Sequence, residues 1–108
     1  MNFDDLRRRA LEIKNKYSDL NKAKGQNVWG GKDYAMGFVG DVGDLQKLIM
    51  SIENMRSIDD ARDKLGHELS DCLWSIIILA DYYEIDIEKQ FKEGMDTLDE
   101  KIEKEFNK

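Results

Sequence analysis

The stretch that decides the fold is Leu65–Ala80, which reads LGHELSDCLWSIIILA. Its apolar residues recur at spacings of three and four, the period of an α-helix with one buried side. They are Leu65, Leu69, Cys72, Leu73, Ile76, Ile77 and Leu79. The longest apolar run, SIIILA, is far too short to span a bilayer. The pattern therefore predicts the most buried helix of a soluble domain, ending at about Tyr83.

Three further helices are predicted around this central element. The first covers about 4–24, and the second covers about 32–52 after a loop that contains Gly30 and Gly31. The fourth begins after Asp86, a residue type that caps helices. Its apolar side is formed by Ile87, Phe91, Met95, Leu98, Ile102 and Phe106.

The remaining signals concern the fold class. Ser57 followed three residues later by Asp60 predicts a capping box before the third helix. Proline is absent, no segment alternates as a strand does, and 108 residues suit one domain, 1–108. We therefore predict an all-α, four-to-five-helix bundle. Apolar stripes on the outer helices exceed the needs of one thin bundle, which predicts a homodimer or a dimer of dimers.

The charge and cysteine content exclude several function classes. The net charge is −6 and the isoelectric point is near 4.8. That balance argues against nonspecific nucleic-acid binding, because phosphate contacts need a basic face. A single cysteine, Cys72, fits a reducing compartment, and the first residues do not have the pattern of a signal peptide. A cytoplasmic location without membrane association is the expectation.

Two acidic pairs lie at matching positions on neighbouring predicted helices. Asp41 and Asp44 are three residues apart on the second helix, and Glu68 and Asp71 are three apart on the third. Both pairs border the apolar side of their helix, where four carboxylates would repel one another unless protonated or neutralised. Oxygen-only ligands favour Mg²⁺, or alternatively Mn²⁺. The competing interpretation is four ordinary surface acids among 23, but two pairs in matching frames favour the metal site.

Glycines surround the first acidic pair in Gly37–Leu45, GFVGDVGDL. Each glycine inside a helix costs about 1 kcal/mol relative to alanine. One interpretation is that Gly37, Gly40 and Gly43 let a phosphate chain or another helix approach the acids closely. The other is simple close packing of helices, and the two interpretations are compatible.

GFVGDVGDL together with HELSDCLWSIIILADYYEIDIEKQFKEGMD resembles the MazG-like all-α nucleoside triphosphate pyrophosphohydrolases, nearest in frame to the dCTP pyrophosphatase branch. The family signature is Glu-Glu-x-x-Glu on one helix and Glu-x-x-Asp on the next. The second half is intact here as Glu68 and Asp71, whereas Gly40, Asp41 and Asp44 stand in the first half. The resemblance covers residues 29–102. It implies a bundle of this type and Mg²⁺-dependent cleavage of a nucleoside triphosphate, with the four acids as metal-binding and catalytic residues.

Other family positions are not retained. Ser75 stands where many relatives have a tyrosine, and Ser51 stands where they have a tryptophan. Gly94 and Leu98 replace a lysine and an asparagine of the last helix, of which the lysine meets the phosphates. The base and phosphate contacts are therefore open, and so, to a lesser degree, is catalysis.

Four residues are candidates for these contacts. Trp29 and Tyr34 could stack on a base, or could equally plug the edge of the core. Lys64 could meet the phosphates, and Ser75 occupies the position of the family tyrosine. The alternative to an enzyme is a non-catalytic helical module that serves as a nucleotide sensor or as a protein-interaction partner.

Overall fold

The computed structural model describes residues 1–54 and 56–108. It contains four α-helices, namely α1 (Phe3–Ala23), α2 (Gly31–Ile52), α3 (Ala61–Tyr82) and α4 (Ile87–Phe106), and no strand within these residues. The predicted all-α fold is confirmed. None of the helices described is long and apolar enough to cross a membrane.

Local side-chain chemistry explains where two of the helices begin. At α1, Asn2 and Asp5 exchange side-chain and backbone hydrogen bonds of 3.0 and 3.1 Å, which satisfies two N–H groups of the first turn. At α4, the Asp86 carboxylate accepts a hydrogen bond of 3.1 Å from the backbone N–H of Lys89, so the predicted cap is confirmed.

The capping box predicted for α3 is wrong. The helix begins at Ala61, and its N-cap is Asp60 in the left-handed conformation with φ of 55°, without a side-chain capping bond. Ser57 therefore lies too far from the first turn to cap it. Ser51 holds the connection instead, because its hydroxyl accepts a hydrogen bond of 3.1 Å from the backbone N–H of Ile58.

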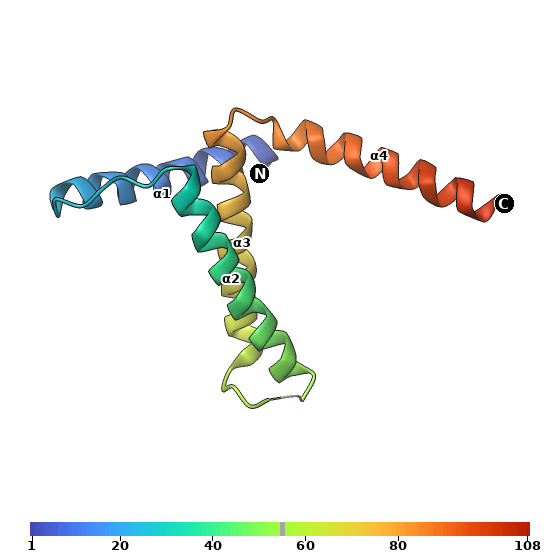
Figure 1. Ribbon diagram of the computed structural model, residues 1–108, viewed down its shortest axis with the longest axis horizontal. Helices are drawn as coiled ribbons and strands as arrows, with labels where there is room; N and C mark the ends of the chain where they lie inside the picture. Colours follow the sequence, from blue (N-terminus) through green and yellow to red (C-terminus); the bar gives the residue numbers. More distant parts are fainter. Residues whose placement is uncertain (55) are drawn as a thin grey trace.

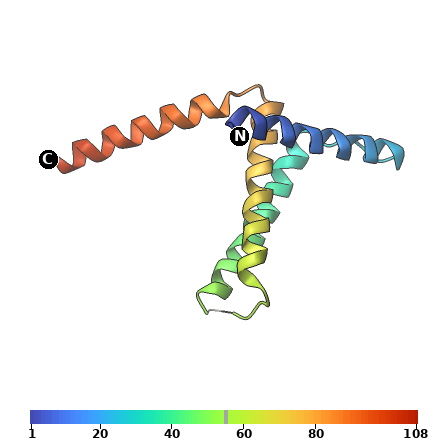
Figure 2. The same cartoon turned by 180° about the vertical axis from the view of Figure 1, so that it is seen from behind.

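The helices form an open arrangement. In Figure 1, α2 and α3 form a long antiparallel hairpin, α1 crosses one end of it, and α4 leaves that same end and projects away. The view from behind in Figure 2 shows the same projection of α4. The molecule measures 60 × 40 × 28 Å. The α2–α3 hairpin is therefore the scaffold on which a site has to be built.

The core lies where α1 crosses the hairpin. It is formed by Ala10, Tyr34, Ile77 and Ile78, and the side chain of Ile78 is fully buried. Trp74 closes this core from the side, because its indole N–H donates a hydrogen bond of 3.1 Å to the carbonyl of Ala10. The prediction that α3 is the most buried helix is confirmed, since it buries more residues than any other helix described.

Three α3 residues predicted to be buried are exposed. Leu69, Leu73 and Ile76 have between 39% and 53% of their surface open to solvent. They share one side of α3, which neither α2 nor α1 covers, because α1 reaches only one end of the hairpin. Periodicity identified an apolar side correctly, but a single chain does not bury all of it.

Candidate metal centre

Three acidic side chains from two helices converge on the hairpin. Asp41 and Asp44 of α2 and Glu68 of α3 each place one carboxylate oxygen within 4.8 Å of the other two. Because α2 and α3 run antiparallel side by side, residues in the middle of each helix face one another. A divalent ion placed among these oxygens would have carboxylate ligands, which suit a hard cation.

Glu68 has an oxygen that lacks a partner. Its Oε2 atom is buried, and no group in the described part of the chain forms a hydrogen bond with it. Burial raises the pKa of the Glu68 carboxyl, and the charges of Asp41, Asp71 and Asp44 raise it further. A buried acceptor without a donor is destabilising, so a proton, a water molecule or a cation at this oxygen would stabilise the fold.

The pKa of the Asp41 carboxyl is raised as well, by burial and by nearby negative charges. Burial raises the pKa of its carboxyl first, followed by the charges of Asp71 and Asp44. Asp71 itself is exposed and lies outside the group of three converging oxygens, although it is near enough to raise the pKa of both neighbours. The structure thus brings together three of the four predicted ligands and places the fourth at the edge.

A cleft of about 750 Å³ opens beside these acids. Asp41 and Asp71 form part of its wall, and so do three of the residues predicted to contact substrate, Trp29, Tyr34 and Ser75. The volume lies within the range of small-molecule sites, about 300–1,000 Å³. Lys64, the fourth predicted contact, does not line this cleft.

The aromatic wall has a defined geometry. The rings of Trp29 and Tyr34 meet edge to face with centroids 5.5 Å apart, and Tyr34 meets Trp74 in the same way at 5.9 Å. A Cβ atom at Gly37 would lie 3.4 Å from the Trp29 ring, an ordinary van der Waals contact, so the indole packs directly over this glycine without requiring it. Trp29 remains about half exposed and can therefore contact a ligand.

Sequence reasoning missed the contribution of α1. Ile13, Tyr17 and Leu20 belong to the apolar stripe of α1, and they line the cleft together with Asn21 and the loop residue Gln26. The available signal was the amide side chain of Asn21 four residues after Tyr17, on the same side of the helix. An apolar stripe that ends in a polar amide is typical of a partly solvated wall as well as of a core.

The other glycines near the acids have no close neighbour in this chain. Cβ atoms built at Gly40 and Gly43 would meet nothing within 4 Å among the residues described. Close packing inside one chain therefore does not explain these two positions. The approach of a ligand or of another helix remains the available interpretation.

Comparisons with protein-family models, with curated proteins and with solved structures find no match for this chain. The resemblance to the MazG-like family consequently depends on the quoted motifs alone. The function has to be argued from the acids and from the cleft beside them.

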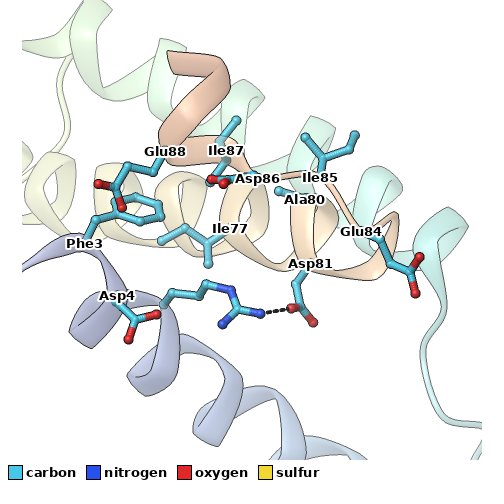
Figure 3. Close-up of a pocket in the computed structure, with 11 residues that line it drawn as sticks. Phe3, Asp4, Ile77, Ala80, Asp81, Glu84, Ile85, Asp86, Ile87 and Glu88 are labelled. Atoms are coloured by element: carbon cyan, nitrogen blue, oxygen red, sulfur yellow. Dashed lines mark hydrogen bonds and ion pairs between the residues drawn. The ribbon is translucent and has the colours of Figure 1, made fainter. Parts of the chain in front are cut away.

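A second cavity, of about 480 Å³, lies where the start of α1, the end of α3 and the start of α4 meet (Figure 3). Its polar lining is mostly acidic and includes Glu84 and Glu88. Its one cationic lining residue, Arg7, forms an ion pair of 2.7 Å with Asp81. This cavity does not include the converging acids, so it is not the candidate site.

Proposed function

We propose that this protein is a Mg²⁺-dependent nucleotide pyrophosphohydrolase, with Mn²⁺ as an alternative ion, that cleaves a nucleoside triphosphate to the monophosphate and pyrophosphate. The observation that carries the proposal is the buried, unpartnered Oε2 of Glu68 beside Asp41 and Asp44. These acids adjoin a cleft with aromatic walls. A charged cluster of this kind gives a purely structural domain no stability, because like charges repel.

The donor set fits a hard divalent cation. The three converging side chains offer carboxylate oxygens, the ligands that Mg²⁺ and Mn²⁺ prefer, and the unpartnered Glu68 oxygen is an acceptor that a cation would satisfy. When bound, such an ion polarises phosphate oxygens and lowers the pKa of a coordinated water. Asp41, Asp44 and Glu68 would hold it.

The other residues have separate tasks in this proposal. Asp71, at the edge of the cleft, orients the attacking water and accepts its proton as the water oxygen bonds to the α-phosphorus. The bond from that phosphorus to the bridging oxygen breaks, and pyrophosphate leaves. Trp29, about half exposed, offers an aromatic face to the base, a contact that tolerates many bases, whereas Tyr34 is only 3% exposed and supports the Trp29 ring from the core. Ser75 is part of the cleft lining but is only 3% exposed, so it has no assigned contact with the substrate.

A second candidate function is supported by the missing cations. No lysine or arginine is among the described residues that line the cleft, and Lys64 lies outside it. A triphosphate bound there would have only the metal to balance its charge. A non-catalytic module with the same acids, acting as a nucleotide sensor or as a protein-interaction partner, would not need further phosphate contacts.

Calorimetry and a turnover assay separate the two. Mg²⁺ and Mn²⁺ are titrated with and without a nucleotide, and canonical, deoxy and modified nucleoside triphosphates are assayed for pyrophosphate release. The enzyme predicts divalent binding and release from at least one substrate. Asp44→Asn and Glu68→Gln should weaken metal binding at least about tenfold and reduce turnover with it. Asp99→Asn, an exposed acid on α4, is the matched control and should change neither.

Two other outcomes are informative. Binding of metal and nucleotide without pyrophosphate release from any substrate would favour the non-catalytic module. Absence of divalent binding, even with a nucleotide present, would reject the metal site itself.

A further inference from the structure

The chain exposes far more surface than a compact protein of its size. Its accessible surface is 8458 Å², whereas a compact monomer of 12.6 kDa exposes about 6,200 Å². Its radius of gyration is 17.5 Å, whereas about 13 Å is typical of this length. The excess, roughly 2,200 Å² per chain, falls in the range of large, permanent interfaces when two chains share it.

Part of the excess is an apolar side of the α2–α3 hairpin. Val42 and Ile49 of α2 and Leu69, Leu73 and Ile76 of α3 are each between 39% and 53% exposed, and they define the hairpin face. At 100° per residue, these positions lie about a quarter to a half turn around their helices from the metal-site acids. The hairpin face and the acidic cluster therefore occupy different sides of the hairpin.

Helix α4 contributes a second apolar surface. Phe91, Met95, Leu98, Ile102 and Phe106 are between 43% and 81% exposed, and they define the α4 stripe. Phe91 and Ile102 are eleven residues apart, as are Met95 and Phe106, so the stripe runs almost straight along the helix. The opposite side is polar and charged. Most of the stability of a helix in a protein comes from packing of its apolar side, and α4 projects away from the rest of its own chain.

We propose that two copies of this chain pair reciprocally, with the α4 stripe of each copy lying along the hairpin face of the other. The lengths match, because α4 with 20 residues is about 30 Å long and the 22-residue helices of the hairpin are about 33 Å long. One two-fold interface covers both apolar surfaces and closes on itself. Pairing of α4 with α4 alone would leave the hairpin face in water, and pairing of hairpins alone would leave the α4 stripe in water.

The first test is the mass of the full chain in solution without metal or nucleotide, since this pairing does not depend on the proposed function. Light scattering at micromolar concentration should report about twice 12.6 kDa. Leu73→Glu on the hairpin face and Phe91→Glu on the α4 stripe should each yield monomers, because each places a charge in the interface. Thr97→Glu, on the polar side of exposed α4, is the control and should remain dimeric.

The second test distinguishes reciprocal pairing from like-with-like pairing. A mixture of Leu73→Glu and Phe91→Glu chains contains one intact α4 and one intact hairpin face, so reciprocal pairing restores one complete contact. The mixture should return to the dimer mass. If α4 paired with α4 and hairpin with hairpin, each contact in the mixture would still carry a charge, and the dimer would not reform.

Milder variants guard against misfolding. Leu73→Ala and Phe91→Ala keep the helices and should weaken dimerisation at least about tenfold. A wild-type mass near 12.6 kDa, or a mixture of the two glutamate variants that stays monomeric, would overturn the proposal.

Discussion

The end of the α2–α3 hairpin that α1 crosses and the middle of the hairpin differ in how they treat charge and burial. At the end crossed by α1, the rings of Tyr34 and Trp74 meet edge to face, and the side chain of Ile78 is fully buried. The indole N–H of Trp74 donates a hydrogen bond to the carbonyl of Ala10. Away from that crossing, Asp41 and Glu68 concentrate like charge in a partly buried cluster. The crossing therefore stabilises the fold, whereas the acids in the middle repel one another, a repulsion that the proposed cation would relieve. Stability and ligand binding should respond to different mutations.

The largest effect on the free energy of unfolding is expected where α1 crosses the hairpin. Ile78→Ala removes most of a fully buried side chain and should lower the free energy of unfolding by about 2–5 kcal/mol, measured by urea denaturation. The metal affinity of the protein that remains folded should be unchanged. Val39→Ala, at a position 70% exposed, is the control and should have little effect. A loss below 1 kcal/mol for Ile78→Ala would mean that the core lies elsewhere.

A smaller effect is expected for Trp74→Phe. The variant keeps an aromatic ring but removes the hydrogen bond to the Ala10 carbonyl, which should cost about 1 kcal/mol. Since Trp74 also lines the cleft, nucleotide affinity should fall, whereas metal affinity alone should not. Tyr17→Phe, which keeps its ring against Trp74, provides the comparison in thermal denaturation. Equal stability of Trp74→Phe and the wild type would show that the hydrogen bond contributes nothing.

Gly43→Ala tests the middle of the hairpin, next to Asp44. A Cβ there meets nothing within 4 Å in the described chain, so the substitution should stabilise the metal-free protein by about 0.5–1 kcal/mol. Gly31→Ala should do the opposite, because its Cβ would collide with the hydroxyl of Tyr83. If Gly43→Ala stabilises the fold but weakens nucleotide binding, the glycine is retained for the approach of the ligand. A destabilised variant would show that another chain already contacts this position.

The smallest effect concerns pH. The pKa values of Asp41 and Glu68 are raised in the folded state, so folded protein holds their protons more tightly than unfolded protein. This contribution to stability is complete below the ordinary carboxyl pKa, about 4, and is lost as pH rises through the raised values. In metal-free protein, Asp44→Asn should reduce that loss by less than about 1 kcal/mol, because the cluster is partly solvated.

Thermal denaturation of wild type and Asp44→Asn at several pH values measures this difference. Subtracting the variant from the wild type removes the titration of the other acids, and Asp99→Asn should superimpose on the wild type. Added Mg²⁺ should raise the wild-type melting temperature most at neutral pH, where the carboxylates are ionised. An Asp44→Asn variant that is destabilised by more than about 1 kcal/mol while still binding metal would identify Asp44 as a structural hydrogen-bonding residue.

Local chemistry is the part that could be predicted from the sequence. Apolar spacing of three and four residues located the helices, and Asp86 marked the start of α4 through its own side chain. The spacing of Asp41 from Asp44 placed both acids near one side of α2, and three of the four predicted ligands converge. These results depend on contacts within a few residues along the chain, which a periodic pattern encodes directly.

The tertiary structure decided everything that depends on distant segments. It placed the N-cap of α3 at Asp60 and not at Ser57, and the hydroxyl of Ser51 accepts a hydrogen bond from the backbone N–H of Ile58 in the connection. The crossing of α1 made Tyr17 part of the cleft wall, and Lys64, in the first turn of α3 at the other end of the hairpin, lies outside the cleft. An apolar stripe indicates that one side of a helix packs against another segment. Which segment covers it, and whether that segment belongs to the same chain, depends on how the helices meet in space.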